Sequence, residues 1–218
     1  MNRIFTTILG VSLGTGSLAF ADITFNTPAN TDLGTTYTFV LNGANIVATG
    51  YNHNGSVTDL FAKSGGENGL GLNSDPSGDH EIWFKGESKD FVQLDVSDAL
   101  NKGFANFMFE MDSTTLGEQW EVSACATAGV LCSNASSIIG SGEGAFIAVP
   151  SNLSLSSPYL DFISFGCKGG GTACGDDNVL VSALSDTPGK VPEPDSIVLL
   201  STVVLGLAGF AIRRKRLA

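Results

Sequence analysis

Apolar and polar residues alternate with a period of two in several short runs of this 218-residue chain. Within residues 104–111, one face would carry Ala105, Phe107, Phe109 and Met111, and the other Asn106 and Glu110. Two more runs place Trp120, Val122 and Ala124 opposite Gln119, Glu121 and Ser123, and Val92, Leu94 and Val96 opposite Phe91, Gln93 and Asp95. Because successive side chains of a strand point to opposite faces, the pattern predicts strands with one buried and one solvent-facing side.

Further short apolar runs predict strands at 36–41, 45–51, 57–63, 80–84, 159–165 and 179–184. Clusters of Gly, Asn, Asp, Ser and Pro separate the runs, as turns do. One short helix is expected at 97–102, with Ser97 as its N-cap and Gly103 as its stop. Roughly nine to eleven short strands with frequent turns indicate an all-β fold, a single β-sandwich of jelly-roll type.

The N-terminus has the pattern of a secretory signal. Arg3 supplies a positive charge, residues 4–18 are mostly apolar, and Ala19 and Ala21 form a small-x-small cleavage pattern. We therefore expect residues 1–21 to be a signal peptide and the mature chain to start at Asp22.

A second apolar segment, residues 197–212, lies near the C-terminus. In a helix it would span roughly 24 Å, slightly less than a ~30 Å hydrocarbon core. A basic cluster follows it directly: Arg213, Arg214, Lys215 and Arg216. Such a cluster stops transfer on the cytoplasmic side, and its long side chains can snorkel to the interface. We expect a transmembrane helix at 197–212, with residues 22–190 forming a body outside the cytoplasm.

The charge is distributed unevenly. The whole chain has a net charge of -11, with 43% hydrophobic residues, which excludes a disordered polyanion. Residues 22–190 contain 20 acidic residues, 6 lysines and no arginine, a net charge of -14. A nucleic-acid partner is therefore not expected, because binding the phosphate backbone requires Lys and Arg.

Pro192, Glu193 and Pro194 stand just before the apolar segment. Prolines so close together break regular structure and leave an extended, accessible backbone. The order of Pro-Glu-Pro, apolar helix and basic cluster over residues 191–218 resembles the PEP-CTERM sorting signal of Gram-negative bacteria. The resemblance implies cleavage by a membrane-embedded exosortase and a final place at the cell surface or outside the cell. It also implies a bacterium that makes extracellular polysaccharide or biofilm matrix.

All four cysteines lie in the expected body: Cys125, Cys132, Cys167 and Cys174. An even number of cysteines in an exported chain favours disulfides. Of the three connectivities we expect Cys125–Cys132 and Cys167–Cys174, each closing a short loop. A four-cysteine zinc site is the alternative, but zinc ligands normally stand two to four residues apart.

Residues 67–81 form a Gly-rich acidic loop. Its carboxylates at Asp75, Asp79 and Glu81 could contribute to a structural calcium site, since calcium takes six to eight oxygen ligands. A solvated loop with Asx turns, or an acid pair of Asp79 and Glu81, would explain the same residues. No other cofactor is expected.

Trp83 follows this loop, between Ile82 and Phe84. If its neighbours point inward, Trp83 is exposed and could stack on a sugar ring of an extracellular polysaccharide, with Tyr51 or Tyr159 nearby. A tryptophan buried between two covered sheet faces is the alternative.

The chain lacks a recognisable catalytic motif. It has two histidines, no nucleophile elbow, no phosphate-binding Gly-Lys-Ser/Thr loop and no His-Glu-x-x-His. We therefore expect a non-enzymatic exported surface or matrix protein. The alternatives are a carbohydrate-binding module that uses Trp83, supported by calcium, and a polysaccharide hydrolase or lyase that uses a carboxylate pair.

Overall fold

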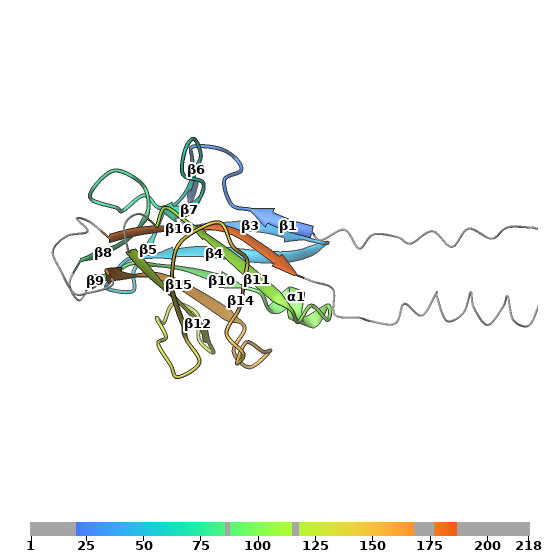
Figure 1. Cartoon of the computed structure of the whole chain (residues 1–218). Helices are drawn as coiled ribbons and strands as arrows, with labels where there is room; N and C mark the ends of the chain where they lie inside the picture. Colours follow the sequence, from blue (N-terminus) through green and yellow to red (C-terminus); the bar gives the residue numbers. More distant parts are fainter. Residues whose placement is uncertain (1–20, 86–87, 115–117, 168–176, 187–218) are drawn as a thin grey trace, which may run out of the picture.

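Short strands with apolar inner faces build the body in the computed structural model, which describes residues 21–85, 88–114, 118–167 and 177–186 (Figure 1). These residues form two sheets, in which each paired strand runs antiparallel to its neighbour, and one short helix. The prediction of a mostly β fold is thereby confirmed.

The first sheet, sheet A, runs in the order β14 (Ile147–Ala148), β11 (Phe107–Asp112), β16 (Asp177–Asp186), β7 (Gly69–Leu72), β6 (Leu60–Lys63) and β2 (Thr31–Gly34). Strand β16 also pairs with β1 (Ala21–Thr24) and β8 (Ile82–Lys85), and β8 pairs with β9 (Ser88–Lys89). The long strand β16 is therefore the common partner of four strands.

The second sheet, sheet B, runs in the order β13 (Ile138–Ser141), β12 (Glu118–Cys125), β15 (Tyr159–Cys167), β10 (Phe91–Asp95), β4 (Ala44–Tyr51) and β3 (Thr36–Leu41). Strand β5 (Val57–Thr58) pairs with β4. The helix α1 (Ser97–Asn101) follows β10.

The main core lies between the two sheets. Phe109 of sheet A packs edge-on against Trp120 and Phe162 of sheet B, with ring centroids 5.3 and 5.6 Å away. All three side chains are almost completely buried. Edge-to-face packing of aromatic rings adds about 0.5–1.5 kcal/mol per pair to the free energy of burying their surface.

Several predicted strands coincide with observed ones, but three expectations are corrected. The predicted strand 57–63 is two strands, because the chain leaves sheet B after Thr58 and enters sheet A at Leu60. The strand expected from His80 starts at Ile82, because His80 has a left-handed backbone with φ 61°. The N-cap of α1 is Val96 and not Ser97, whose amide instead donates to Asp95 Oδ1 at 2.9 Å.

The outer face of sheet B also differs from the prediction. The alternating pattern assigned Gln93, Glu121 and Ser123 to a solvent-facing side, yet each is at most 3% exposed. Both faces of β10 and β12 are therefore covered, one by the core and the other by a loop described below.

Gly140 of β13 illustrates how closely the core is packed. A Cβ atom there would lie 2.3 Å from Cζ2 of Trp120. Only a residue without a side chain lets β13 pass this close to the indole ring, since such a contact is far inside van der Waals distance.

We predict that Gly140→Ala lowers the free energy of unfolding by about 2 kcal/mol, because overpacking a filled site forces the backbone or the ring to move. In a Trp120→Phe background, which removes the clashing atoms, the added cost of Gly140→Ala should fall below about 0.5 kcal/mol. Urea unfolding of the four proteins measures this coupling. Purely additive effects would contradict the packing explanation.

Candidate functional site

A row of polar side chains crosses the outer face of sheet B. Gln93 of β10 lies opposite Asp161 of β15, and Asp161 lies opposite Ser123 of β12. These three residues belong to three adjacent strands, so the pleat directs their side chains to the same face. All three are buried, and Asp161 is 0% exposed.

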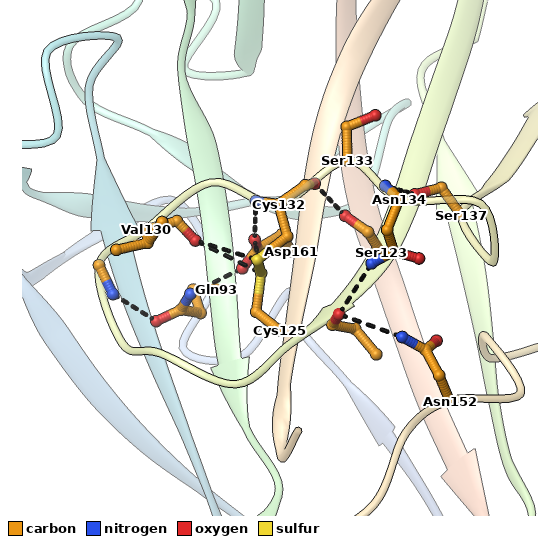
Figure 2. The surroundings of a disulfide bond; sticks show 12 residues. Gln93, Ser123, Cys125, Val130, Cys132, Ser133, Asn134, Ser137, Asn152 and Asp161 are labelled. Carbon is orange, nitrogen blue, oxygen red and sulfur yellow. Dashed lines mark hydrogen bonds between the residues drawn. A yellow bond between two sulfur atoms is a disulfide. The ribbon is translucent and has the colours of Figure 1, made fainter. Parts of the chain in front are cut away.

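The carboxyl group of Asp161 is held from two sides (Figure 2). Gln93 Nε2 donates to its Oδ1 at 2.7 Å, and the backbone amide of Cys132 donates to its Oδ2 at 2.9 Å. The same Oδ2 lies 2.7 Å from Cys125 Sγ. Burial raises the pKa of Asp161 to about 7, because the ionised form loses its hydration, although both donors oppose the shift.

The two sulfurs beside Asp161 form the Cys125–Cys132 disulfide, with the two Cα atoms 5.7 Å apart. This confirms the predicted pairing. Cys125 is the last residue of β12, and Cys132 belongs to the segment 126–137 that follows, which we call the cover loop. The disulfide therefore ties the middle of the cover loop back to the C-terminal end of β12, the strand that precedes the loop.

The cover loop lies over the outer face of sheet B. The amide of Gly129 donates to Gln93 Oε1 at 2.9 Å, and Leu131 packs against a small cluster of Tyr51, Phe91 and Ile163. Gly129 has φ 72°, and a Cβ there would lie 3.3 Å from the Tyr51 ring. A glycine is thus favoured at this position by both its backbone conformation and the close aromatic ring.

Hydrogen bonds to β12 hold the second half of the cover loop. Ser133 Oγ donates to Glu121 Oε1 at 2.7 Å, and Asn134 Nδ2 donates to the Ala124 carbonyl at 3.1 Å. Ser123 Oγ also donates to the carbonyl of Cys132. The buried polar residues of β12 are therefore the anchor points of the loop.

The chemistry of this site follows from its atoms. Cys125, Cys132 and Asp161 bring potential ligand atoms within 4.8 Å of one another, and no other trio of His, Cys, Asp or Glu in the described part of the chain does so. The two sulfur atoms form a disulfide, which can be reduced to two thiols.

Two of the three candidate calcium carboxylates, those of Asp75 and Glu81, are bound by protein donors. Asp75 accepts hydrogen bonds from the amides of Ser77 and Glu81 at 2.9 and 3.2 Å, whereas Asp79 is exposed. The carboxylates of Asp75, Asp79 and Glu81 are not among the trios within 4.8 Å in the described residues. The structure thus gives the loop the Asx turn that was the alternative explanation, with Asp75 as the acceptor.

Glu81 belongs to a second buried polar cluster. Lys63 Nζ lies 2.6 Å from Glu67 Oε2 and also bonds Glu81 Oε1, and Ser113 Oγ donates to the same Oε1 at 2.9 Å. Burial raises the pKa of Glu81 to about 7, against the influence of Lys63. Ser113 and Glu81 are at most 4% exposed, and the cluster joins Lys63 of β6 to the residue before β8 and the residue after β11.

The burial of Trp83 is intermediate between the exposed and the buried side chain that the sequence suggested as alternatives. Its side chain is partly buried, and its Nε1 has no hydrogen-bond partner in the described structure. Tyr51, a suggested neighbour for sugar stacking, is instead stacked on Phe91 under the cover loop, with centroids 4.7 Å apart.

Several predicted residues fall outside the described part of the chain. They are Ala19, Cys174, the motif Pro192, Glu193 and Pro194, the apolar segment 197–212, and the basic residues Arg213, Arg214, Lys215 and Arg216. The side chain of Cys167 is likewise not described, so its pairing stays a prediction. Ala21 is the first residue of β1. Among the described residues, no helix is both long and apolar enough to span a bilayer.

Comparison of the chain with protein-family models, with curated proteins and with solved structures found no match. Its function is therefore inferred from its own residues.

We predict that replacing both Cys125 and Cys132 by alanine lowers the free energy of unfolding by about 2.5 kcal/mol, the chain-entropy value for a loop of this length. The fold should persist, because Gly129 and Leu131 still hold the cover loop to sheet B. Urea unfolding and circular dichroism measure both effects. An unfolded double variant would show that the disulfide, and not the core, sustains the fold.

We also predict that stability depends on pH through Asp161. Between about pH 4 and 7 the folded protein keeps a proton that the unfolded chain has released, so the free energy of unfolding falls as pH rises. Asp161→Asn should reduce this slope by one proton, about 1.4 kcal/mol per pH unit.

Urea unfolding at half-unit pH steps tests this prediction. Glu81→Gln is the comparison variant, because the pKa of Glu81 is also raised to about 7 and its cluster is separate from Asp161. Each substitution should remove the contribution of its own carboxyl group to the slope of the free energy of unfolding against pH, and the two effects should add. Parallel profiles for the wild type and Asp161→Asn would refute the assignment.

Proposed function

We propose that this chain is an exported protein of the PEP-CTERM type. Residues 1–21 direct export, residues 22–190 form an extracytoplasmic β-sandwich of jelly-roll type, and residues 191–218 form the sorting signal. The helix 197–212 anchors the protein in the inner membrane until an exosortase cleaves near the Pro-Glu-Pro motif. The body then remains at the cell surface or in the extracellular matrix.

The observation that carries the proposal is the order of three features. Pro192, Glu193 and Pro194 precede the apolar segment 197–212, and four basic residues follow that segment directly. Each feature alone is common. Together they supply an accessible cleavage region, a membrane anchor and a cytoplasmic stop, in the order that membrane processing requires.

Two structural features support the proposal. The Cys125–Cys132 disulfide suits an oxidising compartment outside the cytoplasm. In addition, Ala21 pairs with Asp186, so β1 and the end of β16 lie side by side (Figure 1). The two segments that carry the processing signals therefore join the body at the same end, and their removal would take only Ala21 from β1.

A non-enzymatic role suits the described polar clusters. In the cluster of Lys63, Glu67, Glu81 and Ser113, the serine and Glu81 are almost fully buried and so are not open to a substrate, whereas Lys63 and Glu67 are partly exposed. Its groups bind one another between the ends of β6, β8 and β11 and thereby stabilise sheet A. The body would act through its surface, which is acidic because residues 22–190 have a net charge of -14.

We predict that replacing Pro192, Glu193 and Pro194 by alanine blocks processing in a host with an active exosortase. The protein should accumulate uncleaved in the membrane fraction, because the enzyme no longer meets its recognition segment. Immunoblotting of membrane and secreted fractions measures this.

Alanine substitution of Thr187, Pro188 and Gly189 is the matched control, since it alters the preceding linker and leaves the motif intact. N-terminal sequencing should give Asp22 for both variants, which shows that export itself is unaffected. Normal release of the motif variant would exclude exosortase sorting.

A further inference from the structure

The two sulfurs of the Cys125–Cys132 disulfide differ in their access to solvent. Cys125 ends a buried strand and is 0% exposed. Cys132 lies in the cover loop and is partly exposed. Since disulfides are broken by attack of a thiolate on one sulfur, an external thiolate reaches Cys132 and not Cys125.

A proton donor stands beside the sulfur that would leave. Asp161 Oδ2 lies 2.7 Å from Cys125 Sγ. Neither sulfur of a disulfide carries a proton, so a proton shared by this pair belongs to the carboxyl group. Burial of Asp161 raises its pKa to about 7, so near neutral pH the group can both give and take a proton.

We propose that Cys125, Cys132 and Asp161 form a thiol–disulfide exchange site for a dithiol, in which Cys132 is attacked and Asp161 protonates Cys125. The Cys125–Cys132 disulfide is itself reduced, once per molecule, so the proposal requires no catalytic turnover. The inference does not depend on the sorting signal, and it goes beyond the proposed delivery of the body.

The reaction balances as follows. One thiolate of the dithiol attacks Cys132 Sγ, the Cys125–Cys132 bond breaks, and Cys125 leaves with the electron pair and takes the proton of Asp161. The second thiolate of the dithiol then attacks the mixed disulfide and releases Cys132. The protein disulfide has gained two electrons and the dithiol has become a disulfide. The two protons that the dithiol lost to solvent protonate Cys132 and restore Asp161.

The surroundings stabilise Asp161 after it has given up its proton. Gln93 Nε2 and the amide of Cys132 both donate to the carboxylate, and donors to the charged form favour it. In the reverse direction the carboxylate would take the proton of the Cys125 thiol and produce the attacking thiolate.

Other titratable groups near Asp161 come from three strands. Tyr51 of β4 interacts electrostatically with Asp161 and with Tyr159 of β15. The pKa of Tyr51 is raised, mainly by burial. Glu121 of β12 lies on the same sheet face, with its Oε1 bound by Ser133. It is a buried carboxylate anchored to another part of the cover loop, which makes Glu121→Gln a matched control.

The first experiment measures the reduction of the full-length protein by dithiothreitol between pH 5.5 and 8.5. Alkylation and peptide mapping follow the Cys125–Cys132 bond alone, and each rate is divided by the thiolate concentration. In the wild type, this constant should fall about tenfold as pH rises through 7, because Asp161 loses the proton that the leaving sulfur needs.

For Asp161→Asn, the rate constant per thiolate should be nearly independent of pH. It should lie below the wild-type value under pH 7 and above it at higher pH, where the wild-type carboxylate repels the thiolate. Glu121→Gln should keep the wild-type dependence. A purely structural role of Asp161 would shift the rates at all pH values equally, and parallel profiles would overturn the proposal.

The second experiment needs only the wild type. Reaction with a limiting monothiol, 2-mercaptoethanol, followed by acid quenching and peptide mapping, should place the mixed disulfide on Cys132. Adducts mainly on Cys125 would overturn the proposal, whatever the folding of the variants.

Discussion

A carboxyl group in the middle of a sheet has to find hydrogen-bond donors, because an unpaired buried charge costs several kcal/mol. Asp161 imposes this requirement on sheet B. Its donors come from Gln93 on the neighbouring strand and from the amide of Cys132 in the cover loop. The loop must therefore lie over the sheet, and in doing so it also covers Tyr51 and Phe91. The sandwich thus has a third layer at this place, and the disulfide holds that layer to β12.

The strand pattern was predictable where the strands are long enough to alternate. β3 occupies the predicted residues 36–41, and the inward residues of β11 and β12 were identified correctly, but Ala105, also predicted inward, precedes β11 and is exposed. Two-residue strands such as β9 and β14 are too short to show a period. β7 was missed for another reason. Its glycines let β16 and the His80 backbone approach closely, and its sequence has no polar positions to mark a face.

The candidate site was only half predictable. Cysteine number and spacing indicated the Cys125–Cys132 pair, which depends on local sequence. Asp161 was part of a predicted strand, yet nothing in a single sequence links it to Gln93, which stands 68 residues earlier. Its one signal was a charged residue in an otherwise largely apolar run. The period of two also assigned Gln93 to solvent, because it cannot detect a loop that folds back over the outer face.

Part of the acidity of the body serves to satisfy backbone amides in turns and loops. Each turn leaves backbone amides without a partner, and an aspartate side chain is well suited to accept them. Eight aspartates do so: Asp32, Asp75, Asp90, Asp95, Asp98, Asp112, Asp161 and Asp186. Eight of the 20 acidic residues of the body therefore act as acceptors for backbone amides, and Asp75 is one of them. Asp161 plays the same part from the middle of a strand, where burial changes its affinity for a proton. An aspartate that accepts a backbone amide, as others do in this fold, thereby stands beside a disulfide as a proton donor.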